Sequence, residues 1–375
     1  MRLVDYIKTI IRGGVNSYVR FRRYQLYSKQ FKSYLQLHNF KNEMAPGEED
    51  YLKKWHQLCN RVEPYSYRFF SHFCGYTPNI VPEDVGRSFI EGKLNLSKYL
   101  YAYQDKNLFP EIVGKSNTPR TIVCRINDGA LLDSNYNLAD KELSFYVGNA
   151  KELILKPSVD SCSGRGIVKF QKDRNLFKAV DSEIVLNKEF LYNYNSDFVL
   201  QEAVSQHAFM SKLCPTSVNT IRLALYRSVK SNETIVTAGI IRIGRDGAFV
   251  DNAHAGGMFV GVSVESGTLG KYVVDQYGNK TNKWNNIDYS SELLVVPFWK
   301  KVIEFAKYVG TRVHHHRLLA LDIALDEQGR PILIEYNLDG FSYWLFMYTN
   351  QEVFGKYTDE VIEYCRSKVE PPKKF

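Results

Sequence analysis

The 375-residue sequence predicts an α+β or α/β protein with a helical N-terminal region. Three observations lead to this fold class. Apolar residues recur at helical spacing over residues 3–35, and basic residues fill the other positions. From about Thr121 onward, β-branched and apolar runs alternate with turn residues and with helical patterns. Near the C-terminal end, residues 318–337 read as two apolar strands joined by a tight turn. Strands mixed with helices over this length indicate α+β or α/β.

Helical patterns appear both before and between the expected strands. Gly13 and Gly14 are expected to interrupt or bend the first helix, because glycine is a poor helix former. Residues 62–104 are rich in aromatic side chains and turn residues. Further helices are expected over residues 48–61, 105–114, 141–149 and 297–309. The expected strands cover residues 121–126, 153–156, 167–170, 198–201, 221–226, 235–243 and 258–264, followed by the hairpin.

The positive charge of the chain is concentrated at its beginning. The formal net charge is +8, and residues 1–34 contain eight basic side chains and one acid. The remainder is close to neutral, which argues against a broad nucleic-acid-binding surface. A basic amphipathic helix either lies on an anionic membrane surface or packs on its own domain with a solvated basic face. The sequence leaves both alternatives open.

Composition indicates a globular protein of the cytoplasm. No apolar run approaches the ~20 residues that a membrane-spanning helix needs, and the N-terminal residues do not resemble a signal peptide. The six cysteines are scattered, with no CxxC pair. This spacing argues against a zinc site and a disulfide framework, and it fits a reducing compartment.

The hairpin at residues 318–337 holds the most informative polar residues. Folding it between Gln328 and Gly329 places Asp322 opposite Glu335, and Asn337 then points to the same face as Glu335. Two carboxylates side by side on an apolar hairpin repel each other unless a cation lies between them. Their hard oxygens suit Mg²⁺ or Mn²⁺, and Mg²⁺ held in this way usually also binds substrate phosphates. The alternative is a solvated hairpin whose acids face water.

A loop of small residues separates two expected strands at residues 153–170. Small residues let backbone N–H groups approach an anion closely, and Lys156 before the loop adds a point charge. The Gly-Lys-Ser/Thr ending of a Walker A loop is absent, and the loop returns into a strand. The pattern predicts either a lid over a triphosphate or an ordinary long hairpin loop.

Three further stretches contain polar residues at strand ends. Backbone groups of Gln201 to Ala203 are suited to reading an adenine edge. Asn219 and Arg222 lie before and within an apolar strand, where the arginine needs a phosphate, a substrate carboxylate or a structural ion pair. In the loop at residues 251–257, ligand-facing roles are open to Asn252, His254, Gly256 and Gly257, and so is a plain turn.

Taken in chain order, these motifs resemble the ATP-grasp superfamily. More narrowly, SVNTIR, DNAHAGG and LDIALDEQGRPILIEYN resemble the ATP-grasp proteins associated with sugar transfer and surface-polysaccharide gene clusters. The resemblance covers roughly residues 62–356, and five motifs in the right order form a specific signal. The matching order is Asp105-Lys106, Lys156 with its glycine-rich loop, Gln201-Glu202, Asn219 with Arg222, and Asp322, Glu335 and Asn337.

The resemblance implies an α+β fold in which two lobes clamp a nucleotide. The implied divisions are a basic helical region at 1–61, a mixed helical and loop subdomain at 62–120, a small lobe with the lid at 121–197, a C-terminal lobe with the metal site at 198–356, and a C-terminal helix and tail at 357–375.

The resemblance also implies a role for each matching residue. Lys106 and Lys156 would bind the α- and β-phosphates, and Arg222 would stabilise the transferring phosphoryl group. Glu202 or His207 would lie near the ribose. ATP would be held by Lys106, Lys156, Ser161, Ser163, Gly164, Gly166, Gln201, Glu202, Ala203 and His207. One or two Mg²⁺ (or Mn²⁺) ions would be held by Asp322, Glu335 and Asn337, and the catalytic residues would be Arg222, Lys156, Asn219 and Arg242.

One position departs from the family pattern. Many ATP-grasp ligases have an arginine two residues before the first metal-binding acid, and this chain has Ala320 there. The relatives associated with sugar transfer often have Gly-Trp before that acid, and this chain has Ala320-Leu321. The arginine's role therefore falls to Arg222 or Arg242.

The function implied by the resemblance is an ATP-dependent carboxylate–amine ligase that works through an acyl phosphate. Its substrates would be a carboxylate and an amine, one of them sugar-linked, in capsule or lipopolysaccharide biosynthesis. Two alternatives stay open: a kinase that phosphorylates a carbohydrate hydroxyl, and a non-catalytic, membrane-peripheral assembly protein. The expected location is the cytoplasm, with possible peripheral contact at the inner membrane face through residues 1–34.

Overall fold

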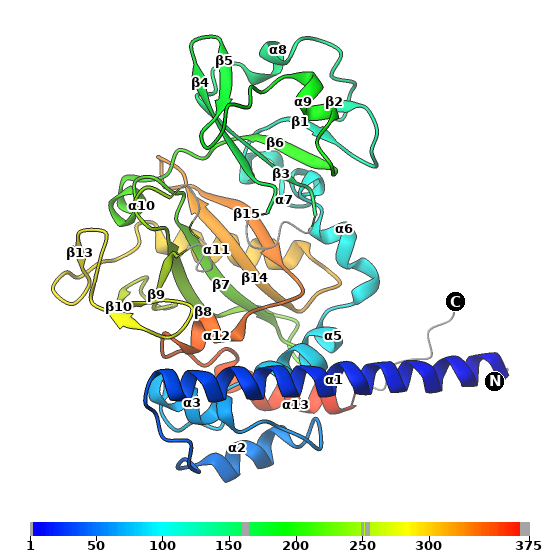
Figure 1. Ribbon diagram of the computed structural model, residues 1–375, viewed down its shortest axis with the longest axis vertical. Coiled ribbons are helices and arrows are strands. Elements are labelled where there is room, and N and C mark those ends of the chain that lie inside the picture. Colours follow the sequence, from blue (N-terminus) through cyan, green and yellow to red (C-terminus); the bar gives the residue numbers. More distant parts are fainter. Residues whose placement is uncertain (1–2, 160–164, 249–250, 252–255, 368–375) are drawn as a thin grey trace.

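The computed structural model describes residues 3–159, 165–248, 251 and 256–367, and of residues 3–15 and 367 only the backbone. Figure 1 shows three parts along the long axis: a helical base, a central lobe around a large sheet, and a smaller lobe that contains the other large sheet. Helices and antiparallel sheets are therefore both present but largely segregated, which settles the fold class as α+β.

The helical base is built on the second half of the long helix α1 (Leu3–Leu37). Phe31 and Leu35 are buried against Phe69 and Phe70 of α3 (Tyr65–Cys74). The helix runs without a break through Gly13 and Gly14, so the expected interruption is wrong. A glycine costs about 1 kcal/mol in a helix, too little to break one that packs along its second half.

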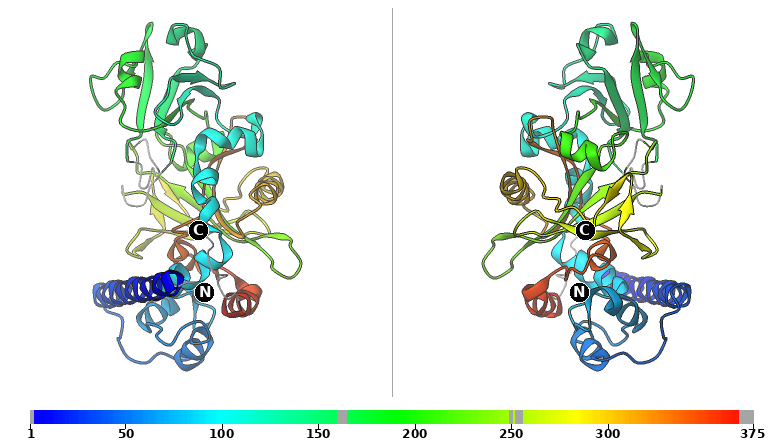
Figure 2. Two further views of the ribbon diagram at one scale, coloured as in Figure 1. Left: turned by 90° about the vertical axis from the view of Figure 1, so that its right-hand side faces the viewer. Right: turned by 90° about the vertical axis from the view of Figure 1, so that its left-hand side faces the viewer.

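Short helices connect the base to the lobes. In the central lobe, one longer helix, α11 (Trp299–Arg312), covers the large sheet, as the side views in Figure 2 show. The remaining helical segments are α2 (Glu48–Trp55), α4 (Glu83–Val85), the π-helix η1 (Gly86–Ile90), α5 (Glu91–Leu94), η2 (Ser97–Tyr99), α6 (Leu100–Gln104), η3 (Lys106–Leu108), α7 (Phe109–Val113), η4 (Lys115–Asn117), α8 (Leu143–Val147), α9 (Lys188–Tyr192), α10 (Ala208–Leu213), α11 (Trp299–Arg312), α12 (Tyr343–Met347), η7 (Gly355–Tyr357) and α13 (Thr358–Ser367).

The smaller lobe contains a six-stranded sheet in the order β2-β1-β6-β3-β4-β5. The boundary predicted at residue 198 needs correction, because β6 pairs with both β1 and β3 and therefore belongs to this sheet. Its strands are β1 (Thr121–Arg125), β2 (Leu131–Asp133), β3 (Glu152–Pro157), β4 (Val168–Asp173), β5 (Leu176–Ala179) and β6 (Phe198–Glu202).

The central lobe contains a seven-stranded sheet in the order β11-β10-β9-β8-β7-β14-β15. A small two-stranded sheet of β12 (Lys283–Trp284) and β13 (Ile287–Asp288) lies beside it. The strands of the large sheet are β7 (Thr220–Arg227), β8 (Thr234–Ile243), β9 (Met258–Val262), β10 (Leu269–Val274), β11 (Lys280–Thr281), β14 (Leu318–Leu325) and β15 (Pro331–Asn337).

The two faces of this sheet have different coverings, because successive side chains of a strand point to opposite faces. On β14, Leu319 and Leu321 face the core beneath α11, whereas Leu318 and Ala320 face the helical base. Asp322 follows Leu318 and Ala320 in the alternation, so its side chain points to the same face, which the helical base covers only in part. The polar residues of the hairpin therefore lie on the face away from α11, beyond Leu318 and Ala320, which pack against the helical base.

No helix within the described ranges is both long enough and apolar enough to cross a membrane.

Candidate active site

The β14–β15 hairpin brings Asp322 and Glu335 directly opposite each other, as the sequence predicted. The pairing register that brings these two acids together depends on an irregularity that the sequence did not predict. Next to the turn Leu325 pairs with Pro331 and Ile323 with Leu333, so the turn is centred on Gln328. A bulge between Asp322 and Ile323 then shifts the pairing by one residue on β15. Without the bulge, Asp322 would lie opposite an apolar residue.

Asp322 is bound by an arginine from the neighbouring strand. Arg222 on β7 donates from Nε to Oδ1 at 2.7 Å and from Nη2 to Oδ2 at 2.6 Å. Asp322 is 1% exposed and Arg222 is also buried, so both charges are largely withdrawn from water. Such two-point contacts are strong and geometrically defined. Arg222 thus has the ion-pair partner that a buried arginine in a strand requires.

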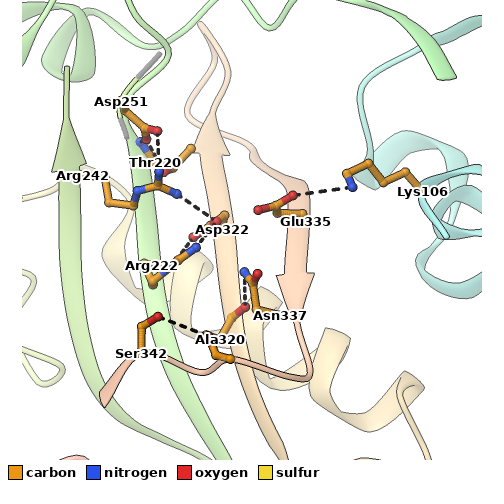
Figure 3. A network of polar contacts seen from close by, with 11 residues as sticks. Lys106, Thr220, Arg222, Arg242, Asp251, Ala320, Asp322, Glu335, Asn337 and Ser342 are labelled. Atoms are coloured by element: carbon orange, nitrogen blue, oxygen red, sulfur yellow. Dashed lines mark hydrogen bonds and ion pairs between the residues drawn. The ribbon is translucent and has the colours of Figure 1, made fainter. Parts of the chain in front are cut away.

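A second arginine extends this cluster. Arg242 on β8 donates from Nη1 to Asp322 Oδ2 at 3.2 Å, and its Nη2 lies 3.2 Å from Asp251 Oδ1. Asp251 in turn accepts hydrogen bonds from the backbone N–H (3.0 Å) and the hydroxyl of Thr220. Figure 3 shows the resulting row of alternating charges across three strands. It fixes both guanidinium groups next to the hairpin acids.

Burial and the charges of this row together shift the pKa values of its two acids in opposite directions. Burial alone would raise the pKa of Asp322, but Arg222 and Arg242 outweigh it and hold the pKa below its ordinary value. Burial raises the pKa of Asp251, because its attraction to Arg242 does not fully compensate. Asp322 is therefore a carboxylate at neutral pH, as a cation ligand must be.

Two lysines from the other side of the site face Glu335. Lys106 of η3 has its Nζ 3.7 Å from Glu335 Oε2, and its backbone N–H donates to Ser158 at 2.9 Å. Lys156 lies on β3 and is 7% exposed. Burial and the nearby charge of Lys106 lower the pKa of Lys156 to about 8, against an opposing effect of Glu335. The site thus has lysines on one side and arginines on the other.

The donor set of the hairpin fits a magnesium ion. A carboxylate offers about four lone-pair positions, and the two arginines occupy one on Oδ1 and two on Oδ2 of Asp322. One position on Oδ1 is left. The Glu335 side chain is 29% exposed and stands on the facing strand. Among the residues that the structure describes, the Asn337 side chain makes one long hydrogen bond, 3.5 Å from Nδ2 to Ala320 O. One oxygen from each residue is available to a hard cation.

The end of β6 lies where the chain passes from the smaller lobe to the central lobe. Gln201 is buried and donates to Pro119 O at 3.4 Å, while Ala203 donates its backbone N–H to Glu152 O at 3.0 Å. The Glu202 carboxylate pairs with Arg120 Nε at 2.7 Å. His207 caps α10 by accepting from Phe209 N through Nδ1, at 3.1 Å. Their assignment to adenine and ribose stays a prediction.

Asn219 is the predicted catalytic residue whose contacts are mainly structural. It is fully buried, and its Nδ2 donates to Met210 O and Cys214 O at 2.7 and 2.9 Å. Its Oδ1 accepts from Ser217 and from Gly244 N. These bonds fix the segment between α10 and β7. Asn219 therefore helps to position the beginning of β7, the strand that carries Arg222.

The glycine-rich loops are described only in part. Gly166 has φ +75°, and Tyr194 donates to its carbonyl at 2.7 Å, which anchors one end of the expected lid. Gly256 has φ +86° and precedes Gly257 and β9. The other predicted loop residues, Ser161, Ser163, Gly164, Asn252 and His254, lie outside the described residues.

Two supporting residues were missed by sequence reasoning. Thr220 and Asp251 fix Arg242, yet neither was singled out. The available signal was Arg242 itself, because a charged residue within an apolar strand requires a partner. Asp251 begins the polar loop already considered for ligand binding, so an acid was present there.

One comparison with known proteins identifies a family. A family model described as "Sugar-transfer associated ATP-grasp" matches residues 87–362. A search of curated proteins finds no match. The match begins later than the predicted start at residue 62 and ends slightly beyond the predicted end at residue 356.

Solved structures resemble the chain at low identity. They include the ADP complex of N5-carboxyaminoimidazole ribonucleotide synthetase (13% identity, TM-score 0.38, covering 66% of this chain and 48% of that one). An L-amino acid ligase from Bacillus licheniformis has 10% identity and a TM-score of 0.35, with 65% and 42% covered. The D-Ala:D-Ser ligase VanG from Enterococcus faecalis has 15% identity and a TM-score of 0.39, and the match covers 70% of this chain and 61% of that one. The aligned part is thus about half the length of these proteins.

The family match includes both sheets and the residues of the β14–β15 hairpin. It confirms the resemblance and the ATP-grasp fold expected from the order of the motifs. With most of its length covered by the family model, the chain belongs to the sugar-transfer associated ATP-grasp family.

Proposed function

We propose that the protein is an ATP-dependent ligase that joins a carboxylate to an amine through an acyl phosphate. The observation that supports this most is the arrangement around Glu335. Lys106 approaches from one side, and Arg222 and Arg242 are fixed beside Asp322 on the other (Figure 3). The buried Lys156 lies close enough to Lys106 and Glu335 for both charges to act on its pKa. A phosphoryl transfer needs positive charge on both the leaving and the transferring phosphate groups, with little other chemistry from the protein.

The proposed reaction has two steps. A substrate carboxylate oxygen attacks the γ-phosphorus of ATP, the bond from that phosphorus to the β-phosphate oxygen breaks, and ADP leaves with the bonding electrons. The amine nitrogen then attacks the acyl carbon, inorganic phosphate leaves, and the nitrogen loses a proton. Both steps develop negative charge on phosphate oxygens, which fixed cationic groups stabilise.

Each part of the cluster has a role in this proposal. Lys106 and Lys156 bind the α- and β-phosphates, and Arg222 and Arg242 bind the transferring phosphoryl group. Backbone groups of Gln201 to Ala203 hold the adenine. Asp322, Glu335 and Asn337 would hold Mg²⁺, which neutralises charge on the β- and γ-phosphates when bound. Asp322 has a second role, because it fixes the orientation of both arginines.

The family description supports a choice of substrate class. An association with sugar transfer suggests a sugar acid or an amino sugar as one substrate and an amino acid or amine as the other, in capsule or lipopolysaccharide biosynthesis. The loop around Gly256 and Gly257 lies next to Asp251 in the chain, and so next to the partner of Arg242. We assign this loop to substrate binding.

The test is release of ADP and phosphate from ATP in the presence of Mg²⁺ and pools of sugar acids, amino acids and amines. Turnover should require both a carboxylate and an amine. Glu335→Gln should reduce turnover at least about 100-fold, because it removes a charged metal ligand. The control is Glu327→Gln, which changes an exposed acid in the turn of the same hairpin. Turnover with a carbohydrate alone would indicate a kinase instead, and equal effects of both variants would contradict the assigned site.

We further propose that α1 brings the protein to an anionic membrane surface. Its second half packs in the helical base, and the N-terminal part extends beyond the rest of the molecule (Figure 1). The exposed side chains on the described part include Tyr18, Phe21 and Leu26 as well as basic Arg22 and Lys29. Exposed aromatic and basic groups on one helix favour an interface with anionic lipid headgroups.

A further inference from the structure

The segment at residues 83–95, which runs from α4 through η1 and α5, joins the helical base to the β14–β15 hairpin. Asn95 lies at the end of the hairpin opposite its turn, and Glu91 and Glu83 lie against the loop that follows the hairpin. All three residues are at most 4% exposed. A buried polar group is unfavourable unless it is hydrogen-bonded, so the partners of these side chains show what they hold in place.

Asn95 uses its whole side-chain amide on the backbone of the hairpin. Its Nδ2 donates to Leu318 O at 2.8 Å, where β14 begins, and to Leu338 O at 2.7 Å, one residue after β15. Its Oδ1 accepts from the N–H groups of Arg317 and Leu318, both at 3.0 Å. Both donor and both acceptor positions of the amide are therefore used. The side chain ties the first residue of β14 to the residue that follows Asn337.

Asn337 is the proposed metal ligand that depends most on this contact. Within the described ranges its side chain makes one hydrogen bond, 3.5 Å long, to Ala320 O (Figure 3). A bond of this length orients a side chain poorly. The direction of the Asn337 oxygen is therefore set mainly by the backbone at the end of β15, and Leu338 O is the backbone atom that Asn95 holds there.

Two buried acids hold the loop after the hairpin. Glu91 accepts from the N–H group of Gly340 at 2.7 Å, and Glu83 accepts from that of Trp344 at 2.7 Å. Between these two contacts the chain has positive φ at Gly340 (+70°) and at Ser342 (+64°). A residue other than glycine keeps such a conformation only where its surroundings enforce it. The helical base supplies two of the contacts that do so.

From these contacts we propose that Asn95 and Glu91 are positioning residues of the metal site, which hold the backbone just after β15 so that the Asn337 oxygen points toward the cation. The inference rests on the proposed function only through the assignment of Mg²⁺ to the hairpin, and not on the choice between a ligase and a kinase. It extends the site into the helical base. The same segment also contacts α1, because Arg23 donates from Nη1 to Arg87 O at 3.0 Å.

The experiment measures the affinity of the full-length protein for Mn²⁺ by electron paramagnetic resonance, well below the melting temperature. Fluorescence titration with ADP in the presence of EDTA measures nucleotide affinity without the metal. Asn95→Asp keeps an acceptor oxygen but loses the N–H groups that bind Leu318 O and Leu338 O. It should weaken Mn²⁺ binding on the order of 10- to 100-fold, the range for residues that orient metal ligands, and change ADP affinity less than about threefold. The added negative charge alone would attract a cation, so weaker binding reports lost orientation.

The matched control is Phe31→Ala, which lowers the stability of the same helical base by removing a buried ring. It leaves the contacts of Asn95 and Glu91 in place, so Mn²⁺ affinity should stay within about twofold of the wild type.

Glu91 supplies a second pair of variants if Asn95→Asp does not fold. Burial raises the pKa of Glu91 to about 8, so the group is largely neutral at pH 7 and glutamine is its closest substitute. Glu91→Gln keeps an acceptor for the N–H group of Gly340 and should bind Mn²⁺ within about threefold of the wild type, whereas Glu91→Leu should weaken binding about tenfold or more.

The outcomes separate this inference from the proposed function. The inference and the metal assignment are both overturned if the wild type binds no Mn²⁺, or if Glu335→Gln binds it like the wild type. The inference alone is overturned if Glu335→Gln loses Mn²⁺ binding but a folded Asn95→Asp or Glu91→Leu protein retains it. It is also overturned if Phe31→Ala weakens Mn²⁺ binding as much as Asn95→Asp does.

Discussion

Asp322 is the residue on which the proposed chemistry depends most. A single buried carboxylate accepts from two arginines and keeps one lone-pair position for a cation. Removing its charge would leave Arg222 buried without its counter-ion. For Asp322→Asn we predict a loss of about 3–5 kcal/mol in the free energy of unfolding, measured by urea denaturation.

Asp359→Asn is the matched control for that prediction. Asp359 forms an ion pair with Lys54 at 2.7 Å, but its side chain is 80% exposed. An exposed pair contributes less than about 1 kcal/mol. Equal losses in the two variants would show that Asp322 is not the buried partner of the arginines.

The proposed contact between Lys156 and a phosphate would make nucleotide binding dependent on pH. Its pKa in the free protein is lowered to about 8, so above pH 8 it is increasingly neutral and has to take up a proton before it can pair with a phosphate. ATP affinity should therefore fall between pH 8 and 9.5, by up to about tenfold per pH unit. Fluorescence titration with ATP at each pH measures the affinity. Lys156→Arg should give a flat profile of affinity against pH over this range, because arginine stays charged. A fall of equal size in that variant would assign the titration to another group.

Sequence reasoning identified Asp322 and Glu335 as a facing pair, because turn residues and strand alternation are local properties. It did not find the bulge that produces the register. Residues 332–334 are all apolar, and none of them differs from its neighbours in a way that marks an extra residue. The contact between Arg242 and Asp251 was also not predicted. It depends on the path of the loop after β8, which brings Asp251 back to Arg242 on that strand.

At the scale of elements, α1 combines two roles along one helix. Phe31 in its second half is 2% exposed and packs on Phe69 and Phe70, so Phe31→Ala should lower the free energy of unfolding by about 3–5 kcal/mol. The matched control is Leu26→Ala in the same helix, where the side chain is 60% exposed and the expected change is within about 0.5 kcal/mol. Thermal and urea denaturation measure both. A small loss for Phe31→Ala would mean that α1 is not part of the core.

The strands were easier to predict from the sequence than the helices of the base. Runs such as residues 221–226 and 235–243 are continuous and β-branched, and both became strands of the central sheet. The break expected at Gly13 and Gly14 did not occur, since tertiary packing along one half of a helix outweighs two poor helix formers. A cavity of about 140 Å³, lined among others by Tyr27 of α1 and Trp344 of α12, was not foreseen, because its lining residues are far apart in the sequence.

At the scale of the whole molecule, the charge distribution separates α1 from the catalytic lobes. Most of the net charge of +8 belongs to residues 1–34, whereas the active-site lysines and arginines are balanced by nearby acids. Reversing two exposed charges of α1 with Arg22→Glu and Lys29→Glu changes the charge of the helix by four units. At about 1 kcal/mol per charge near the surface, this should weaken binding to vesicles containing phosphatidylserine on the order of 1,000-fold.

The control for this reversal is Lys300→Glu with Lys307→Glu on α11, which changes the net charge equally on exposed positions of another helix. Vesicle co-sedimentation at low and high salt measures both pairs. Equal weakening would show that only total charge matters, and α1 would then have no specific part in membrane contact.

The central claim is that ATP is used to activate a carboxylate. Hydroxylamine tests it most directly, because it intercepts an acyl phosphate whatever the natural amine is. The protein is incubated with ATP, Mg²⁺, hydroxylamine and a pool of sugar acids and amino acids, and hydroxamates are measured by mass spectrometry. We predict ATP-dependent hydroxamate formation by the wild type and by Glu327→Gln, and none by Glu335→Gln. ATP consumption that yields a phosphorylated sugar and no hydroxamate would contradict the account.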